Sequence, residues 1–278
     1  MDCFESLETG NVAYKVTFVD GRKDNDWQMQ QIKAFIERGV DVMIVELVKY
    51  SSAAQVTQLA DAANIPVVYF LVRPDEEDMD ALSSICYVGW NIPQSGTCQG
   101  EIITNLPDRG DINGDGIVSY VMIMGEPEDF LTWPRTESVV KALTDAGIEV
   151  EELVTDYGYW EDIKGCTIMA NALDKYGEKI EVVFCNNDAM ALGALDAIRR
   201  ANRIVGEDIY LVGIDALYEA LNAVKNGEMT GTVFDDYPSQ ARAAVDAAIN
   251  YLDGRENDKY ILIDYVPVTK GWIHPAWG

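Results

Sequence analysis

The sequence predicts an α/β protein made of two doubly wound parallel-sheet lobes that are joined by a multi-stranded hinge. Three observations predict this fold. The chain has 278 residues, which suits two domains of ordinary size. Short and almost continuously apolar runs alternate with amphipathic segments of helical length, and this alternation starts again after residue 90. Apolar strands separated by amphipathic helices are typical of a parallel sheet that is buried on both faces.

The first lobe opens with β-rich apolar runs that predict strands, and segments with apolar residues at helical spacing lie between them. The expected strands are residues 12–19, 41–47 and 66–71, and the expected helices are residues 27–38 and 52–63. The first of these helices should stop at Gly39, because glycine readily adopts the left-handed conformation that closes a helix.

The second lobe repeats the pattern, and helical and strand segments remain after it. Its expected strands are residues 118–124, 149–155, 180–185, 209–214 and 231–234. Its expected helices are residues 133–146, 162–176, 189–202 and 217–226. A further helix over 237–252 and a last strand over 260–267 indicate that the chain crosses between the lobes more than once. We therefore expect residues 1–90 with 237–263 in the N-terminal lobe, and residues 91–236 with 264–278 in the C-terminal lobe.

The charge balance excludes one large class of partners. Lys and Arg number 21 against 47 Asp and Glu, which makes the formal net charge −26. Such a surface repels phosphate backbones, so we expect no nucleic-acid partner and favour an uncharged ligand or a cation.

The apolar runs are far shorter than the roughly 20 residues that a membrane span needs. The five cysteines contain no CxxC pair, and Cys86, Cys166 and Cys185 are expected to pack in the core.

A loop at residues 111–119 carries the most specific local signal. Oxygen donors recur at the spacing of the EF-hand calcium loop, and Gly116 permits the sharp turn. The donors are Asp111, Asn113, Asp115, the carbonyl of Ile117, and Ser119. Met122 stands where the bidentate Glu of an EF-hand would be, so another carboxylate must complete the site. The loop predicts Ca²⁺ binding; the alternative is a surface turn rich in Asp, Asn and Gly.

Several consecutive motifs resemble a known family. They are VMIMGEP at 121–127, KIEVVFCNNDAMALGA at 179–194, VGIDALYEAL at 212–221 and GTVFDD at 231–236. With the calcium loop, they resemble the galactose/glucose-binding proteins of bacterial ABC sugar uptake, which are type I periplasmic binding proteins. The resemblance implies a monosaccharide held between two lobes without covalent chemistry, and delivery of that sugar to an ABC permease.

The resemblance also implies roles for particular residues. Glu181 matches the remote calcium carboxylate, Trp160 the aromatic residue that stacks on the sugar, and Arg135 the Arg after the GEP strand. Asn187 and Asp215 match sugar-binding residues at strand ends. The alternatives are a core aromatic for Trp160, a solvated helix residue for Arg135, and helix N-capping for Asn187 and Asp215.

The sequence departs from the family pattern at several pocket positions. Leu71 and Leu131 replace polar residues, while Asp129 and Asp235 stand where the family has His and Asn. Loss of a hydrogen-bonding partner lowers affinity for a ligand hydroxyl. We therefore expect a sugar that resembles galactose or glucose, or another neutral sugar or related polyol, with Asp129 and Asp235 among its contacts.

The N-terminus departs as well, because the chain lacks the strand and the Asp-x-Phe motif that open the family's sequences. We expect residues 12–19 and 41–47 to lose their shared neighbour, and Met1 to be an internal methionine of a longer protein. No export signal is visible at Met1. The resemblance places the natural protein in the periplasm, or outside the cell and associated with the membrane, as a monomer.

Three other functions are alternatives to a transport binding protein. A sensor that presents its closed form to a chemoreceptor or kinase would use the same pocket. An enzyme is disfavoured because the chain has a single His, His274, and lacks a nucleophile–base pair, a P-loop and a GxGxxG motif. The remote enzymatic alternative is a glycoside-acting enzyme that uses Asp129 and Asp235 as its carboxylate pair. A repressor core would need a DNA-binding headpiece. We therefore predict a binding protein and no enzyme.

Overall fold

The computed structural model describes residues 13–80 and 82–272, and the chain divides into two compact units. Unit 1 comprises Met1–Trp90 and Asp236–Ile263, and unit 2 comprises Asn91–Asp235 and Asp264–Gly278. The chain thus passes between the units three times. The division differs from the predicted one at Asp236, which was expected in the C-terminal lobe and belongs to unit 1.

Unit 1 contains a parallel sheet of strand order β1-β2-β3-β9. Its strands are β1 (Met43–Val45), β2 (Val67–Phe70), β3 (Ile85–Trp90) and β9 (Tyr260–Ile263). Its helices are α2 (Asn25–Arg38), α3 (Ala53–Ala62), α4 (Glu76–Asp80) and α10 (Tyr237–Leu252). Helix α2 ends as predicted at Gly39, whose φ is +66°.

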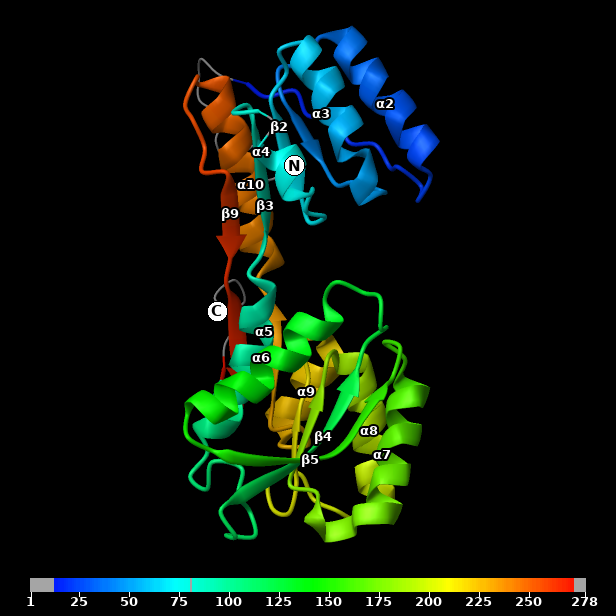
Figure 1. The fold of residues 1–278 in the computed structure, drawn as a ribbon, viewed down its shortest axis with the longest axis vertical. Coiled ribbons are helices and arrows are strands. Elements are labelled where there is room, and N and C mark those ends of the chain that lie inside the picture. Colours follow the sequence, from blue (N-terminus) through cyan, green and yellow to red (C-terminus); the bar gives the residue numbers. More distant parts are fainter. Residues whose placement is uncertain (1–12, 81, 273–278) are drawn as a thin grey trace. The chain divides into compact units, whose positions relative to one another are not determined.

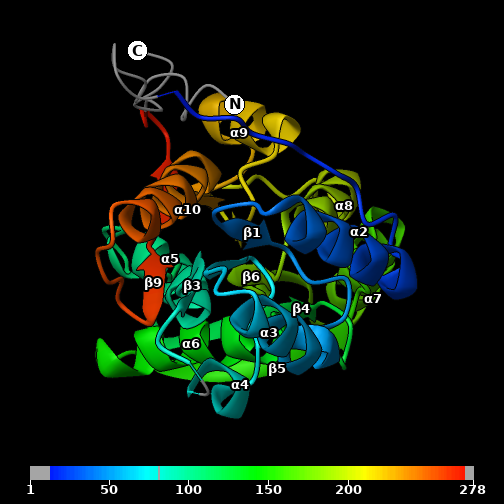
Figure 2. The ribbon, with the colours of Figure 1, turned by 90° about the horizontal axis from the view of Figure 1, so that it is seen from above.

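Both faces of this sheet are buried, which explains the near-continuous apolar strands. Val67 and Tyr69 of β2 pack in the cluster formed with α2 and α3, whereas Val68 between them packs against α10. Figure 2 shows α10 on one side of the unit 1 strands and α2 with α3 on the other. Successive side chains of a strand point to opposite faces, so each face receives apolar residues.

The strand predicted over residues 12–19 does not form over the described residues 13–19. Tyr14 and Val16 are half-buried against the α10 cluster, while Phe18 is 71% exposed and Val19 is 51% exposed. A strand needs the backbone of a neighbour for its hydrogen bonds. No described strand pairs with this segment. Its side chains therefore alternate in burial as in a strand, but its backbone forms no hydrogen-bond ladder with a described neighbour.

Unit 2 contains a six-stranded sheet of order β10-β8-β7-β6-β4-β5, in which only the β10–β8 pair is antiparallel (Figure 1). The strands are β4 (Ile117–Met124), β5 (Glu149–Tyr157), β6 (Val182–Cys185), β7 (Tyr210–Val212), β8 (Gly231–Asp235) and β10 (Tyr265–Thr269). The helices are α5 (Ile92–Thr104), α6 (Thr132–Asp145), α7 (Asp162–Tyr176), α8 (Asp188–Arg200) and α9 (Tyr218–Asn226).

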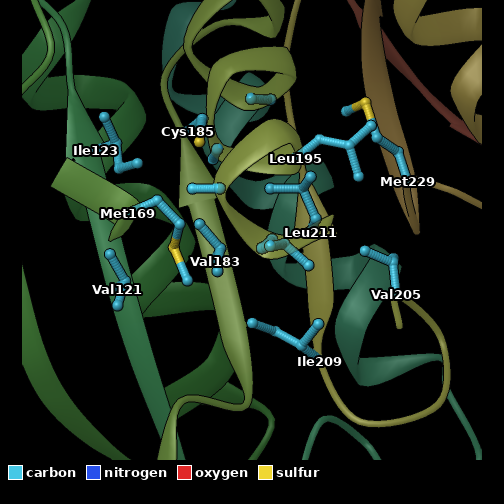
Figure 3. Packing of buried hydrophobic residues seen from close by; sticks show 14 of the residues in the cluster. Val121, Ile123, Met169, Val183, Cys185, Leu195, Val205, Ile209, Leu211 and Met229 are labelled. Atoms are coloured by element: carbon cyan, nitrogen blue, oxygen red, sulfur yellow. The ribbon is translucent and has the colours of Figure 1, made fainter. Parts of the chain in front are cut away.

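The largest described core of unit 2 lies between this sheet and helices α7, α8 and α9. Val121 and Ile123 of β4, Val183 and Cys185 of β6, and Leu211 of β7 are all 0% exposed in this cluster (Figure 3). The alternate residues Tyr120 and Met122 are also buried. The sheet is therefore covered on both faces, and the predicted doubly wound α/β fold is confirmed.

Several features of the fold escaped prediction, including strand β3 and helix α4, to which no predicted element corresponds. The single strand expected over 260–267 is wrong: it is two strands, β9 and β10, which belong to different sheets. The chain changes unit at Asp264, which is a single charged residue between two apolar runs. Helix α5 was not assigned because Pro93, Gly96 and Gly100 lower its intrinsic helix propensity.

The described cysteines are free thiols, three of them buried (Cys86, Cys98 and Cys185) and Cys166 half-buried. Burial raises the pKa of Cys86 to about 11 and that of Cys98 to about 12, so these thiols stay protonated and pack as small apolar groups. Over the ranges 13–80 and 82–272, no helix has the length and apolar character of a membrane span.

Helices α5 and α6 approach so closely that only glycine fits at position 96. A Cβ there would overlap the Arg135 carbonyl oxygen and lie 2.9 Å from the Val139 nitrogen. We expect Gly96→Ala to lower the free energy of unfolding by about 1–3 kcal/mol, as overpacking does. In an uncrowded helix the same change would stabilise by about 1 kcal/mol. Urea unfolding measures whether Gly96→Ala lowers or raises the free energy of unfolding. Thr97→Ala, one residue along the same helix, is the control.

Candidate functional site

The candidate site lies at the carboxyl end of the unit 2 sheet, where the strand order reverses. From β4 the chain continues to β5 on one side, and then to β6 on the other side of β4. Ligands of open α/β sheets bind at such a switch point, in the crevice outside the carboxyl ends of the strands. The residues that follow β4, β5, β6 and β7 therefore decide the chemistry of this edge.

Asn186, directly after β6, joins three segments at the switch point. It is fully buried, and its Oδ1 accepts from the Gly125 backbone nitrogen at 3.1 Å and from Thr136 Oγ1 at 3.2 Å. Its carbonyl accepts from Arg135 Nη1 at 2.5 Å. Asn186 therefore positions the end of β4 and the Arg of α6. Asn187 was predicted as a site residue, whereas its neighbour Asn186 was not.

Gln99 of α5 holds the next strand ends together, and it too was missed. Its Nε2 lies 2.9 Å from the carbonyl of Cys185 and 3.1 Å from that of Val212, which end β6 and β7. Gln99 is 0% exposed. A buried amide that satisfies the carbonyls of two strands stabilises the loops that follow them.

Arg135 lies at the centre of the site. It is 4% exposed, so the alternative of a solvated helix residue is wrong. Its Nη1 lies 3.4 Å from Asp215 Oδ1, and its guanidinium carbon lies 5.9 Å from the centre of the Trp160 ring. Its Nε is buried without a hydrogen-bond partner among the described residues. A buried donor of this kind is costly unless an acceptor reaches it, so Arg135 fits a ligand oxygen.

Asp215 faces Arg135 from the loop after β7. Its φ of +114° is strained for a residue other than glycine, and such strain concentrates at functional sites. The alternative of N-capping is wrong for Asp215, because the N-cap of α9 is Leu217. Burial raises the pKa of the Asp215 carboxyl, and the nearby Arg135 partly offsets the rise.

Asn187 does cap a helix, as its alternative interpretation states. Its side chain accepts from the Met190 nitrogen at 3.0 Å and closes the first turn of α8. Asn187 is 8% exposed at the strand end beside Asn186. The cap uses the side-chain oxygen, so the amide nitrogen is the atom that could donate to a ligand. Its role in binding therefore stays a prediction.

Trp160 comes from the turn between β5 and α7, with a φ of +64°. The ring is half-buried and packs in part against the apolar cluster of α7 and α8, as the core alternative expects. It also lies so close to Gly125 that a Cβ there would overlap the indole ring. Trp160 thus presents an aromatic surface beside Arg135 while its inner edge belongs to the core.

Asp235 lies near Arg135 and Asp215, whereas the described hydrogen bond of Asp129 is local to its own turn. Asp235 ends β8 directly opposite Tyr265 of β10. Burial is the main cause that raises the pKa of Tyr265. The nearby charge of Arg135 lowers this pKa, and the charges of Asp235 and Asp215 raise it further. Tyr265 therefore lies near all three charged residues. Asp129 Oδ1 accepts from the Leu131 nitrogen at 2.9 Å, which is a contact within the turn before α6. Tyr265 was not predicted as a site residue.

Asp188 lies beneath Asp215 and is fully buried. Its two oxygens accept from Thr232 Oγ1 at 2.7 Å and from the Leu217 nitrogen at 2.8 Å. Burial nevertheless raises the pKa of Asp188 well above its usual range. Burial therefore favours the neutral, protonated form of Asp188, which supports the Asp215 loop through these two hydrogen bonds.

The raised pKa of Asp188 predicts a pH dependence of stability. The folded state holds this proton more tightly than the unfolded chain, so the free energy of unfolding falls as pH rises above the unfolded pKa of about 3.9. Asp188→Asn removes the titration. The difference in unfolding free energy between wild type and variant should therefore be smaller at pH 7 than at pH 5, by up to about 1.4 kcal/mol per pH unit. An equal difference at both pH values would contradict this.

The loop at 111–119 folds around its own side chains. Asp111 Oδ1 accepts from the Gly114 and Asp115 nitrogens at 2.8 and 3.1 Å. Glu181 is 1% exposed, and its two carboxylate oxygens accept from the Asn113 nitrogen at 3.0 Å and the Ser119 nitrogen at 2.9 Å. The predicted remote carboxylate therefore does lie at the loop.

Two observations limit the fit of this loop to a metal ion. Ser119 Oγ lies 3.4 Å from Glu151 Oε2 on the neighbouring strand, so it is directed towards β5. Within the described ranges, no three His, Cys, Asp or Glu side chains converge as a metal ion would require. The hard oxygen donors suit Ca²⁺, but carboxylates alone do not form its shell here.

Comparisons with known proteins agree with this architecture. The periplasmic binding protein domain family matches residues 3–256. A D-galactose/methyl-galactoside binding periplasmic protein of Haemophilus influenzae is 30% identical over 273 residues, covering 92% of this chain and 80% of that protein. A proposed rhizopine-binding protein of Rhizobium meliloti is 33% identical over 253 residues, covering 90% and 78%.

A solved structure extends the agreement to three dimensions. It is an ABC transporter solute binding protein of Bacillus halodurans with bound myo-inositol, which is 28% identical with a TM-score of 0.71 and covers 96% of this chain and 88% of that one. These relatives are binding proteins rather than enzymes, so the prediction of no enzyme is confirmed. The chain belongs to the type I periplasmic binding proteins, the sugar-binding family that serves ABC transporters.

Proposed function

We propose that the chain binds a monosaccharide or a cyclitol of similar size at the carboxyl edge of the unit 2 sheet, outside the cytoplasmic membrane, and delivers it to an ABC permease. The observation that carries the proposal is the buried guanidinium of Arg135, with an unpartnered Nε, between Asp215 and Trp160. The guanidinium donates to ligand oxygens, the carboxylate accepts from hydroxyls, and the indole contacts an apolar ring face.

The ligands after which the relatives are named support this class of ligand without narrowing it to one compound. They include galactosides, ribose and myo-inositol. All are compact polyols, and their hydroxyl groups can bind to the hydrogen-bond donors and acceptors of the site. Galactose and glucose are the narrower proposal, although Leu71 and Leu131 stand at two positions where the resembling family has polar residues.

A thermal-melt screen tests the proposal. The purified chain is melted with hexoses, pentoses and cyclitols, including galactose, glucose, ribose and myo-inositol. A ligand that binds only the folded state at 100 times its Kd stabilises by about 2.7 kcal/mol and raises the Tm. Asp215→Asn should lose the shift, and Asp196→Asn, on the exposed side of α8, should keep it. No shift with any polyol would overturn the proposal.

The partners follow from the same proposal. Delivery requires an ABC permease, and a chemoreceptor that reads the ligand-bound form is a second predicted partner. We also expect a monomer, which size-exclusion chromatography with light scattering measures directly. A stable dimer at micromolar concentration would contradict that expectation.

We further propose that the loop at 111–119 with Glu181 holds Ca²⁺. Asp111, Asn113, Asp115, the Ile117 carbonyl and Glu181 would supply oxygens, and Ser119 would bind through water. Burial raises the pKa of Glu181, although the Ser119, Asn113 and Ile112 nitrogens donate to it, and the nearby Asp111 raises it further. A divalent cation would offset this cost of gathered negative charge.

Chelation tests the calcium proposal. With Ca²⁺ at 100 times its Kd, we expect about 2.7 kcal/mol of stabilisation and a higher Tm, which EDTA reverses. Asp111→Asn should melt alike in Ca²⁺ and EDTA, while Asp196→Asn should respond like wild type. Equal Tm values for the wild type in Ca²⁺ and EDTA would sink the proposal and leave the loop as a self-bonded turn.

A further inference from the structure

A cavity of about 380 Å³ lies in unit 2 between helix α6 and strands β4 and β5. Among the described strands, β5 pairs only with β4, so the cavity lies at the edge of the sheet. Arg135, Trp160 and Asp215 do not line it, which separates it from the candidate site. Its volume falls within the range of about 300–1,000 Å³ that is usual for small-molecule sites.

The floor of the cavity is mostly apolar and buried. Tyr120 and Met122 of β4 line it and are 4% and 1% exposed, and Val140 of α6 forms a half-buried wall. Thr155 of β5 also lines the cavity, and its hydroxyl oxygen is buried without a hydrogen-bond partner among the described residues. A buried hydroxyl without a partner is costly, so this position favours an occupant that donates a hydrogen bond.

The rim of the cavity is acidic. The exposed carboxylates Glu137 and Glu152 line it, and Glu152 accepts from the Tyr120 hydroxyl at 3.3 Å. Lys141 also lines the cavity, but its ammonium lies 2.5 Å from Asp145 and pairs with it. All 21 Lys and Arg residues belong to the part of the chain that the structure describes, and none of them forms an ion pair with Glu137 or Glu152. The rim therefore favours a cationic occupant.

We propose that this cavity is a second binding site, which takes a small primary amine with an apolar body. An ammonium has three donors, which suit the two rim carboxylates and the Thr155 hydroxyl. The apolar body packs on Met122 and Val140 and loses its contact with water. The formal net charge of −26 also raises the local concentration of cations at the surface.

The floor of the cavity also touches the residue that positions Arg135. Thr136 lines the cavity, and its Oγ1 lies 3.2 Å from Asn186 Oδ1. Met122 Sδ lies 3.9 Å from Asn186 Nδ2. The Asn186 carbonyl in turn accepts from Arg135 Nη1 at 2.5 Å. An amine that packs against Met122 and Thr136 therefore restrains Asn186 and, through it, the guanidinium, so that the two sites are coupled.

Two probes of the same shape test the site without any sugar. 2-Phenylethylamine joins an ammonium to an apolar ring, and 2-phenylethanol is its uncharged counterpart. By calorimetry we expect a Kd below about 1 mM for the amine and about tenfold weaker binding of the alcohol. The advantage of the amine should shrink as salt is raised. Equal binding of both probes, or no binding of the amine at about 10 mM, would overturn the proposal.

Glu137→Gln/Glu152→Gln is the matched variant, because it keeps the size of two exposed side chains and removes their charge. It should weaken binding of the amine about tenfold and leave the alcohol nearly unchanged. Glu149→Gln/Asp156→Asn removes two exposed carboxylates of β5 outside the cavity and should change neither. An equal loss in both double variants would indicate general attraction to an acidic surface and would contradict the site.

Nuclear magnetic resonance of the wild type measures the coupling. Addition of 2-phenylethylamine should shift the signals of the Asn186 side-chain amide and of the Arg135 Nε–H group, and 2-phenylethanol at the same concentration should shift them less. If the amine binds and moves neither signal, the coupling is refuted. None of these measurements uses a sugar, so the outcome is distinct from that of the proposed function.

Discussion

Arg135→Met is expected to abolish ligand-induced stabilisation and to lower the free energy of unfolding by about 3–5 kcal/mol. Arg135 is 4% exposed and lies 3.4 Å from the half-buried carboxylate of Asp215, so its loss removes the partner of that carboxylate and the donor to the Asn186 carbonyl. Removing one partner of an ion pair whose cation is buried typically costs this much. Urea unfolding measures the stability, and the Tm shift with the best ligand of the screen measures binding.

A second substitution separates the two effects of Arg135. In Arg135→Met/Asp215→Asn the unpaired charge is gone, so stability should partly recover while ligand binding stays absent. Arg200→Met, at the exposed end of α8, is the control and should change the free energy of unfolding by less than about 0.5 kcal/mol. If Arg135→Met costs no more than Arg200→Met, the central role of Arg135 is refuted.

Gly125→Ala is expected to weaken ligand binding at least about tenfold. A Cβ at this position would overlap the indole ring, so Trp160 must leave its place beside Arg135. Trp160→Ala should weaken binding to a similar degree because it removes the aromatic face. Calorimetric titration of both variants measures the effect.

The double variant Gly125→Ala/Trp160→Ala tests whether the two changes act through the same contact. With the ring removed, the added methyl group has room, so the double variant should bind no worse than Trp160→Ala alone. Coupling between residues in contact is typically 0.5–3 kcal/mol. Additive losses would contradict the proposed displacement. Glu126→Ala, on the exposed neighbouring residue, should bind like wild type.

The fold could be predicted from sequence where strands are buried on both faces. The predicted strands at 118–124, 180–185 and 231–234 overlap β4, β6 and β8 closely, because their apolar runs begin and end with the sheet. Residues 13–19 show the limit of this reasoning. Their alternation is genuine, but a strand also depends on a neighbour that local patterning does not reveal.

The site was predictable where a residue matches a motif of the resembling family, and less so elsewhere. Arg135, Trp160 and Asp215 were identified and are brought together around one guanidinium. Asn186, Gln99 and Tyr265 were missed because they act on backbone groups or across the β8–β10 pair, and such long-range contacts leave no local motif. The NND triplet after β6 was the available signal for Asn186.

Hydrogen exchange with and without ligand tests the central claim most directly. The account predicts slower exchange in the segments that carry the site, which are residues 124–136, 157–161, 185–188, 213–217 and 233–236, at ligand concentrations that saturate the Tm shift. Protection should be lost in Arg135→Met. Ligand-dependent protection confined to other parts of unit 2, with these strand ends unchanged, would contradict a binding site at the carboxyl edge of the sheet.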